Sequence, residues 1–559
     1  MRKKAIILTL IILPALLIFI YILRPPGDIY FTLPFDNSVF PPEFPSPNFE
    51  WGSKNAYNGP WDVTIVVPVA NFKYKITTEK TNWIPDKQLW DSIKKVSDHK
   101  IINVALNESG KNFRKIRLKF TISTDSVAAP ILYRQMPIPF VLAEKNLDSM
   151  NYRLIDIGSY NTPHIAMKEF PVCGNCHSIT QKGGFIGLDL DAGRRDKGGY
   201  FVASIKDSML FSEKNYMSWT KIENRRTFGL FSKISPDGRY IVTTVKDRVV
   251  GRNYPYGPDH IAFSQLFFPV NGHLAVYDRK EHILKELPGA NSDEYVQSNA
   301  TWTPDSKNIV FCRAKALPMK EDLGDINILN EALIDDFEKG KRSFKYEICI
   351  IPFNEGSGGK AIPLKGASDN GLSNYFPAVS PDGKWIIFCK AKNFMLLQPD
   401  SRLFIIPVKG GKSRLLECNL SSMNSWHAWS PNSKWIVFVS KGLSIYTDMF
   451  LSHIDNKGNA SAPVLLSRAR QFRKVTNYPE FVNINPQRTL NMKYDFVELI
   501  HIQKALDAGN KPLAIALFKK LIKQDHLMLA EDYYLLSNYL YKMDLPEEAA
   551  KYKKIADQK

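Results

Sequence analysis

One short turn sequence recurs four times in this chain of 559 residues, and it constrains the fold more than any other feature. A Ser or Thr is followed by Pro, then by Asp or Asn, and then by Gly or Ser. The copies begin at Ser235, Thr303, Ser380 and Ser430, and each leads into a run of β-branched and aromatic residues. Pro and Asp or Asn favour a tight turn, and the small residue after them tolerates its backbone conformation. Each copy therefore predicts a β-hairpin.

The spacing of the four copies predicts blades of a β-propeller. Their first residues lie 68 (235 to 303), 77 (303 to 380) and 50 (380 to 430) positions apart, which indicates blades with variable insertions. The longest insertion, near residues 320–341, is expected to hold a short helix. A weaker copy begins at Thr180, and Asn477-Tyr478-Pro479-Glu480-Phe481 is a candidate for closing the ring. We predict five or six blades over residues 166–485. The repeats resemble the TolB-type β-propeller of bacterial envelope proteins.

A second motif, Cys173-Gly174-Asn175-Cys176-His177, predicts a cofactor. Two thiols two residues apart, followed at once by a histidine, form the attachment site of c-type haem. Cys173 and Cys176 would link covalently to the porphyrin, and His177 would be the proximal iron ligand. We therefore expect haem c, placed just before the turn of the first blade.

Two other uses of these cysteines are less well supported by the sequence. A structural zinc site needs two more ligands at matching spacing, and no second C-x-x-C exists. A thiol-disulfide exchange motif is the other alternative, but it prefers a βαβ context that the flanking sequence does not provide. The remaining four cysteines stand alone in apolar surroundings and are expected to be buried strand thiols: Cys312, Cys349, Cys389 and Cys418.

The N-terminus predicts a membrane anchor over residues 1–27. A basic head, Met1-Arg2-Lys3-Lys4, precedes about 19 apolar residues, which is enough to cross a bilayer. No small-residue cleavage pattern follows, so we expect an uncleaved signal anchor, with a cleaved signal peptide as the alternative. The positive-inside rule then places the body outside the cytoplasm. The expected location is the bacterial inner membrane, single-pass with the body in the periplasm, or the periplasm itself if the signal is cleaved.

Two further regions flank the predicted propeller. Residues 28–165 contain strand-like runs with period-two alternation, and a short helix is expected from Asp86. This pattern predicts a β-sandwich of the immunoglobulin or fibronectin kind. Residues 495–559 show helical periodicity and resemble about two tetratricopeptide repeats, which usually bind other proteins. A helical cap on the propeller is the alternative. The fold class is thus mainly β, with an anchor, a sandwich, a propeller and a helical repeat.

The charge indicates which partners to expect. The chain has a formal net charge of +18, with 44% hydrophobic residues that suffice for real cores. A basic protein can bind nucleic acid, anionic lipid or acidic proteins. Nucleic acid is not expected outside the cytoplasm. We therefore expect other envelope proteins as partners, acidic redox proteins among them, and the inner membrane through the N-terminal helix.

A c-type iron has a second axial position, and the repeats suggest a ligand for it. Aligning the turn at Ser430 with the turn at Thr180 places His427 on His177. Corresponding residues of different blades lie at one height around the axis, so His427 is the first candidate for the distal ligand. Met423 is the second candidate, and three others are weaker: Met209, Met217 and His164. A hydrogen-bonded structural histidine is the alternative for His427.

The chain as a whole resembles bacterial envelope proteins with an anchor, a β-sandwich, a C-x-x-C-H motif and a TolB-like propeller, some with a tetratricopeptide tail. The segments 228–238 and 423–432 carry this resemblance. It implies an architecture much more than a reaction. We expect a membrane-anchored c-type cytochrome for electron transfer or redox sensing. An envelope scaffold that binds proteins through the propeller and helices is the first alternative. A haem enzyme that acts on a small oxidant is the second, but no catalytic residues can be named.

Overall fold

The computed structural model describes most of the chain from Ile29 to Gln558. The described ranges are 29–54, 59–110, 116–138, 142–143, 149–168, 174–180, 184–190, 198–223, 227–254, 265–318, 328–329, 331–494, 499–523 and 530–558. The predicted anchor, residues 1–27, lies outside them. Within these ranges no helix is both long and apolar enough to cross a bilayer. The chain divides into two compact units, residues 1–124 and residues 125–559.

The described residues of the first unit form two β-sheets and one α-helix. A three-stranded sheet has the order β1-β3-β6, and a five-stranded sheet has the order β2-β8-β7-β4-β5. Aromatic pairs join the two sheets: Phe49 of β3 lies 6.1 Å from Phe120 of β8, and Trp51 of β3 lies 6.2 Å from Trp61 of β4. The elements are β1 (Ile29–Leu33), β2 (Ser38–Phe40), β3 (Phe49–Ser53), β4 (Trp61–Val67), β5 (Phe72–Thr78), β6 (Asn82–Trp83), α2 (Lys87–Ser97), β7 (Ile102–Glu108) and β8 (Ile116–Ile122).

The expected helix after Asp86 is present as α2. The Asp86 carboxylate caps it by accepting a hydrogen bond of 2.8 Å from the Leu89 N–H. Trp90 and Ile93 lie on its buried face. The Trp90 indole donates to the Phe44 carbonyl at 2.8 Å, which ties the helix to the proline-rich segment before β3.

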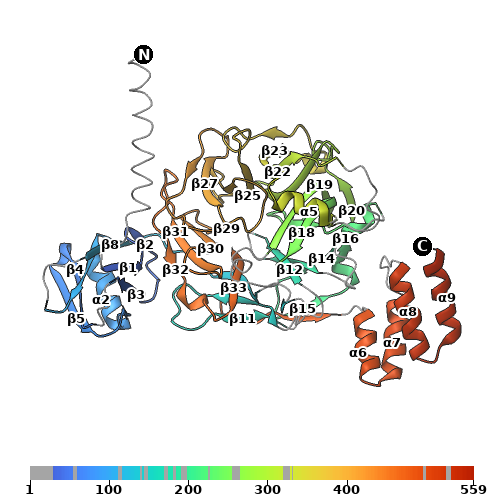
Figure 1. Ribbon diagram of the computed structural model, residues 1–559, viewed down its shortest axis with the longest axis horizontal. Helices are drawn as coiled ribbons and strands as arrows, with labels where there is room; N and C mark the ends of the chain where they lie inside the picture. Colours follow the sequence, from blue (N-terminus) through green and yellow to red (C-terminus); the bar gives the residue numbers. More distant parts are fainter. Residues whose placement is uncertain are drawn as a thin grey trace, which may run out of the picture. The chain divides into compact units, whose positions relative to one another are not determined.

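The second unit is built on six four-stranded antiparallel sheets, coloured from cyan to orange in Figure 1. Five of them use strands in chain order. The first has β12 (Gly174–Ile179), β13 (Phe185–Leu190), β14 (Gly199–Ser204) and β16 (Tyr216–Ser218), and the second has β17 (Leu230–Ile234), β18 (Tyr240–Asn253), β19 (Gln265–Asp278) and β20 (Ile283–Glu286). The third has β21 (Tyr295–Trp302), β22 (Asn308–Lys315), β23 (Glu347–Pro352) and β24 (Ile362–Pro363). The fourth has β25 (Ser373–Val379), β26 (Trp385–Ala391), β27 (Arg402–Pro407) and β28 (Arg414–Leu415), and the fifth has β29 (Asn424–Trp429), β30 (Trp435–Ser440), β31 (Asp448–His453) and β32 (Val464–Leu465).

The sixth sheet joins strands from both ends of this unit, and we call it the closing sheet. Its order is β11 (His164–Met167), β10 (Asn151–Ile155), β9 (Ile131–Pro137) and β33 (Lys474–Phe481). β33 pairs antiparallel with β9, from Lys474 opposite Pro137 to Phe481 opposite Ile131. β9, β10 and β11 were expected in the sandwich that we ended at residue 165. They belong to a blade instead, because β9 pairs with the inner strand β33. This partner lies more than 300 residues further along the chain.

The six inner strands are β33, β12, β17, β21, β25 and β29, and each contacts the next around a closed ring. The sheets are therefore the blades of a six-bladed propeller, whose number lies within the predicted five or six. Each inner strand carries a β-bulge. The short parallel pair of β15 (Ser208–Phe211) and β34 (Asn491–Tyr494) adds a second contact between early and late segments of the unit.

The recurring turn forms as its sequence predicts. In the copy at Ser235, the Ser hydroxyl donates to the Asp237 carboxylate and accepts from the Tyr240 N–H at 2.9 Å. Gly238, with φ of 80°, takes the left-handed conformation that glycine accepts at no steric cost. The weaker copy makes one of these two bonds, since Thr180 Oγ1 accepts from the Phe185 N–H at 3.1 Å.

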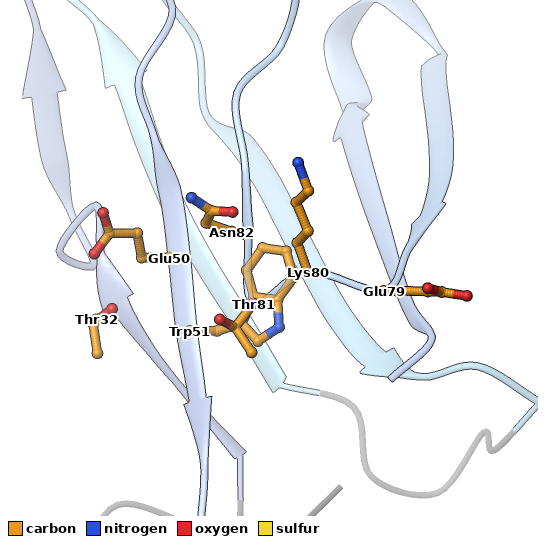
Figure 2. A pocket seen from close by; sticks show the side chains of 7 residues that line it. All are labelled: Thr32, Glu50, Trp51, Glu79, Lys80, Thr81 and Asn82. Carbon is orange, nitrogen blue, oxygen red and sulfur yellow. The ribbon is translucent and has the colours of Figure 1, made fainter. Parts of the chain in front are cut away.

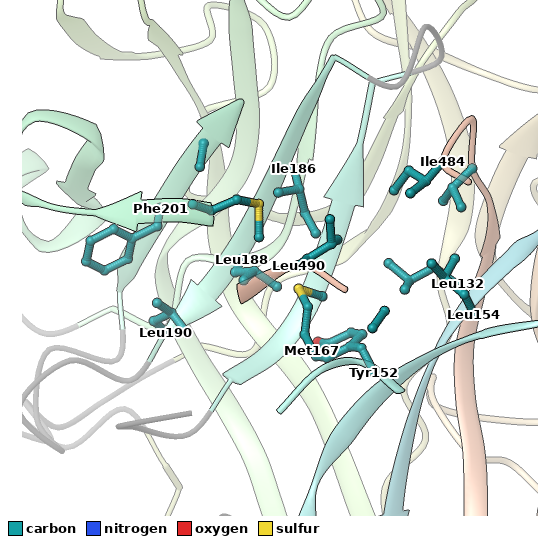
Figure 3. Packing of buried hydrophobic residues seen from close by; sticks show 14 residues of the cluster. Leu132, Tyr152, Leu154, Met167, Ile186, Leu188, Leu190, Phe201, Ile484 and Leu490 are labelled. Carbon is teal, nitrogen blue, oxygen red and sulfur yellow. The ribbon is translucent and has the colours of Figure 1, made fainter. Parts of the chain in front are cut away.

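A hydrophobic core lies at the join between the closing sheet and the blade of β12. It combines side chains from both sheets and from the segment after β33, among them Tyr152, Leu188, Val482, Ile484 and Leu490. Figure 3 shows Tyr152, Leu188 and Leu490 gathered with Met167. Closure of the ring therefore buries apolar surface as well as pairing two strands.

The described α-helices of the second unit include α5 and four helices near the C-terminus. α5 (Glu331–Glu338) lies in the longest insertion, as expected, and Arg252 of β18 forms ion pairs with Glu331, Asp335 and Glu338 of this helix. The C-terminal helices are α6 (Leu499–Asp507), α7 (Lys511–Leu521), α8 (Ala530–Lys542) and α9 (Pro546–Gln558). They share one hydrophobic cluster whose buried members all lie between Leu499 and Tyr552.

Candidate functional site

The C-x-x-C-H motif lies at the beginning of an inner strand. Cys173 falls outside the described residues, and Gly174 begins β12. Gly174 pairs with Leu190 and His177 pairs with Leu188, so the strand bulges between them. The bulge places Cys176 and His177 where β12 meets the inner strands on either side, β33 and β17.

His177 is enclosed and neutral. Its side chain is fully buried. Two tyrosine rings contact the imidazole edge-on, with centroid distances of 5.2 Å for Tyr152 and 5.3 Å for Tyr478. Nε2 lies 3.4 Å from a Glu480 carboxylate oxygen, yet neither ring nitrogen has a hydrogen-bond partner among the described residues. Burial lowers the pKa of His177 to about 4, and the Glu480 charge only partly offsets this effect. A neutral imidazole is the form that binds a metal.

The thiol of Cys176 holds its proton more tightly than that of an ordinary cysteine. It is a free cysteine, and burial, together with the nearby Asp189 carboxylate, raises the pKa of its thiol to about 12. Reactive exchange cysteines have the opposite property, because the thiolate is the nucleophile and their pKa is lowered. The environment of Cys176 therefore counts against the thiol-disulfide alternative.

Charged groups from the two adjacent blades surround the motif. Lys233 of β17 forms an ion pair with Glu480 of β33, and its ammonium lies 4.9 Å from the centre of the Tyr478 ring. Arg134 of β9 and Asp189 of β13 also act electrostatically on Cys176. Burial raises the pKa of Asp189 to about 8. Two cations and two carboxyl groups thus lie near the motif.

His427 occupies the register position that the alignment predicted, but it faces another blade. It stands three residues before Ser430, as His177 stands before Thr180. In β29 the bulge falls on Trp426 and His427, whereas His177 remains paired. The His427 imidazole is buried and donates from Nε2 to the Ile387 carbonyl of β26 at 3.0 Å. This contact gives His427 a structural function, and its role as a distal ligand stays a prediction.

The other distal candidates also have structural surroundings. Met423 is fully buried at the beginning of β29, and its N–H donates to the Pro399 carbonyl at 2.8 Å. Met209 belongs to the core at the join, and Met217 to a neighbouring core cluster. His164 Nε2 lies 2.9 Å from the Thr489 hydroxyl. None of the contacts described for these residues is with His177.

The donor residues are of the types that hold a c-type haem, but the described residues enclose the imidazole, which has no exposed surface and packs against two tyrosine rings. A free thiol and a neutral buried imidazole stand next to each other in the chain, and the imidazole is left without a hydrogen bond among the described residues. Cys173 and Cys176 would hold the porphyrin and His177 would ligate the iron. Groups of three or more His, Cys, Asp or Glu side chains suited to a metal ion are absent from the described part of the chain.

A separate hollow lies in the first unit. Its volume is about 580 Å³, and Figure 2 shows the side chains that line it. They are Thr32, Glu50, Trp51, Glu79, Lys80, Thr81 and Asn82. It contains none of the residues that the sequence singled out.

The buried state of His427 predicts an acid sensitivity. Burial lowers its pKa from 6.5 to about 4, so between these values the unfolded chain takes up a proton that the folded chain does not. Stability therefore falls as the pH drops through this window, by about 2 kcal/mol between pH 7.5 and pH 5 for this one group. We expect His427→Gln, which keeps an N–H donor for the Ile387 carbonyl, to lose about 2 kcal/mol less stability between pH 7.5 and pH 5 than the unaltered protein. Urea unfolding followed by tryptophan fluorescence at both pH values measures it.

An unchanged pH dependence in His427→Gln would contradict this account of the residue. The same variant also tests ligation. A change in the iron spectrum of the matured protein would support His427 as the distal ligand, since a structural hydrogen bond would leave that spectrum as it was.

Comparisons with known proteins show distant similarity in fold. No family model and no curated protein matches the chain. TolB from Acinetobacter baumannii is 13% identical, covers 68% of this chain and 79% of its own, and has a TM-score of 0.39. A putative TolB from Agrobacterium tumefaciens is 12% identical, covers 64% of this chain and 99% of its own, and has a TM-score of 0.33. Hydrazine synthase from Kuenenia stuttgartiensis is 12% identical, covers 74% of this chain and 97% of its own, and has a TM-score of 0.30. All three TM-scores lie below 0.5, so these similarities carry no argument about this chain.

Proposed function

We propose that the protein is a membrane-anchored c-type cytochrome whose propeller supports one covalently attached haem for electron transfer or redox sensing. The observation that carries this proposal is that Cys176 and His177 stand next to each other on an inner strand. There the imidazole is buried, neutral and without a hydrogen bond among the described residues. Haem attached there would supply one-electron chemistry. The protein's own part is to hold the imidazole, exclude water from it and place charges beside it.

The distal position decides between a carrier and an enzyme, because a carrier fills it with a second protein ligand and an enzyme keeps it open for a substrate. We propose the carrier. The distal ligand belongs to the same proposal, with His427 as the first candidate and Met423 as the second.

Partner binding by the C-terminal helices is a second part of the proposal. α6 to α9 form their own core, as paired helices of a tetratricopeptide kind would. Leu513, Tyr534 and Tyr541 are exposed on them. We propose that this region contacts other envelope proteins. An envelope scaffold with haem as an accessory would use the same helices, and it remains the alternative function.

The proposed location follows from the N-terminal sequence. Residues 1–27 would anchor the chain in the bacterial inner membrane, with the body in the periplasm. Haem attachment of this type takes place on that side of the membrane, so anchor and motif are consistent.

Absorption spectroscopy tests the proposed function. The full chain is produced in a bacterial host that assembles c-type cytochromes, purified in detergent and reduced with dithionite. We expect a six-coordinate spectrum that carbon monoxide leaves unchanged, because both axial positions are filled. Rapid binding of carbon monoxide would contradict the carrier function and favour a haem enzyme. A colourless protein would remove the haem altogether.

A further inference from the structure

An exposed turn precedes the strand that closes the ring. The Lys474 N–H at the start of β33 donates to the Gln471 carbonyl at 3.2 Å, which places Phe472 and Arg473 at the tip of the turn. The Phe472 side chain is 84% exposed. Arg473 has φ of 57°, a left-handed conformation that glycine adopts more readily than arginine. The turn therefore displays an aromatic ring and a cation at a cost to its own stability.

Two more exposed apolar side chains lie near this turn. One small hydrophobic cluster joins three segments, because Ala143, Tyr446 and Val475 pack in it. Leu142 stands next to Ala143 and is 51% exposed, and Ile445 stands next to Tyr446 and is 37% exposed. Each segment of the cluster thus presents one apolar side chain to solvent, and for the segment of Val475 this side chain is Phe472.

Hydrogen bonds fix the segment of Ile445 beside the closing strand. The Thr447 hydroxyl donates to the Thr476 carbonyl at 2.9 Å, and the Thr476 hydroxyl donates to the Thr447 carbonyl at 2.8 Å. The exposed side chains are therefore held on packed backbone. We call Leu142, Ile445, Phe472, Arg473 and Lys474 together the turn patch.

The charges of the turn patch are positive. Arg473 and Lys474 follow Phe472 directly, and the Arg473 guanidinium lies 5.1 Å from the centre of the Phe472 ring. Asp448, at the start of β31, does not cancel them because its carboxylate is held by Arg470. The Arg470 guanidinium donates to both Asp448 oxygens, at 2.8 and 3.1 Å. The patch therefore combines apolar side chains with an excess of positive charge.

This combination fits an anionic lipid surface. Aromatic rings are favourable at the level of the lipid headgroups, and cations beside them are attracted to anionic lipid. A stable interface with another protein needs about 800 Å² of surface on each partner, which is much more than three side chains provide. A weak lipid contact suffices for a tethered chain, because the predicted anchor would keep the body near the membrane at a high effective concentration.

We propose that the turn patch rests on the anionic lipid surface of the membrane in which the chain is anchored, with the Phe472 ring among the headgroups and Arg473 and Lys474 at lipid phosphates. This inference rests on the proposed location and is independent of haem. Because the turn leads directly into β33, the contact would hold the propeller to the membrane through its closing sheet.

Photochemical cross-linking of the full chain in bacterial membranes tests the proposal. In Phe472→p-benzoylphenylalanine the reactive ring replaces a ring of similar shape. After illumination we expect the peptide that contains residue 472 to carry the mass of a phospholipid. The matched control is Ile283→p-benzoylphenylalanine on β20, where the residue replaced is 53% exposed and lies near an exposed Lys280–Glu281 pair of balanced charge. We expect no lipid adduct there.

Amide exchange of the full chain in nanodiscs is the second measurement, and it needs no reactive group. Residues 471–473 are expected to exchange more slowly with phosphatidylglycerol in the disc than with phosphatidylcholine alone. In Arg473→Gly this difference should shrink, because one cation is lost. The same variant should keep or gain stability in urea, since glycine accepts the left-handed conformation. A turn with only a structural role would instead exchange more slowly as the fold becomes more stable.

The outcomes separate this inference from the proposals above. A protein adduct at residue 472, equal lipid adducts at residues 472 and 283, or no adduct in a chain that stays in the membrane would overturn the lipid contact and leave the location standing. Recovery of the full chain from cells without detergent would overturn the proposed location and this inference with it. If the cross-linking variant does not fold, exchange that is equal in the two kinds of disc overturns the contact.

Discussion

A chain that ends after Tyr494 is expected to unfold at the same urea concentration as the full-length protein. A chain that ends after Gln471 is expected to show no cooperative unfolding transition for its propeller. The first change removes only the C-terminal helices, whose buried residues pack on one another. The second removes β33 and so leaves β9 without its inner partner.

The size of the second effect follows from burial. The shorter chain also loses Val475, Val482, Ile484 and Leu490, each at most 5% exposed. At about 2 kcal/mol for each buried side chain, the loss is roughly 8 kcal/mol, which is comparable to the whole stability of an ordinary domain. Tryptophan fluorescence against urea measures both chains. Equal midpoints for the two would contradict closure of the ring by β33.

Replacing both motif cysteines is expected to remove all covalent haem and to leave the fold intact. Cys176 is a free cysteine, and its truncation to Ala removes one sulfur atom without leaving a buried polar group unpaired. In Cys173→Ala/Cys176→Ala we therefore expect haem staining on denaturing gels to fall from one haem per chain to none. The free energy of unfolding of the apoprotein, measured with urea, should change by less than about 1 kcal/mol.

The matched control is Cys312→Ala/Cys349→Ala, which alters two fully buried strand thiols. It should keep its haem and lose stability through the small cavities that it creates. Haem that persists in the Cys173 and Cys176 variant would contradict covalent attachment at the motif. Capture of a partner that survives there would favour the scaffold alternative.

The turns were predictable because their chemistry is local. Ser235, Asp237 and Gly238 stand within four residues, and each performs the function that its side chain predicts. The closing sheet was not predictable in the same way. The strands β9 to β11 alternate with period two, as sandwich strands do, and nothing local to them indicates that they pair with β33. Pairing between segments so far apart in the chain leaves no local pattern.

The candidate site was predicted only in part for a related reason. Cys176 and His177 form a contiguous motif that can be recognised from its sequence. Glu480 and Lys233 come from other blades, and only the shared register relates them to His177, because each of the three is the first residue that pairs after the bulge of its inner strand. The same register placed His427 correctly along its strand but could not give the direction of its side chain, since the bulge differs between β29 and β12.

The central claim is that one haem is fixed by thioether bonds to residues 173–177, and a peptide mass measurement tests it most directly. The full chain, matured in a host that assembles c-type cytochromes, is digested, and the peptide containing Cys173 and Cys176 is identified. We predict that this peptide carries the mass of one haem and that no other cysteine peptide does. Recovery of this peptide at its unmodified mass, from protein matured in that host, would contradict the account.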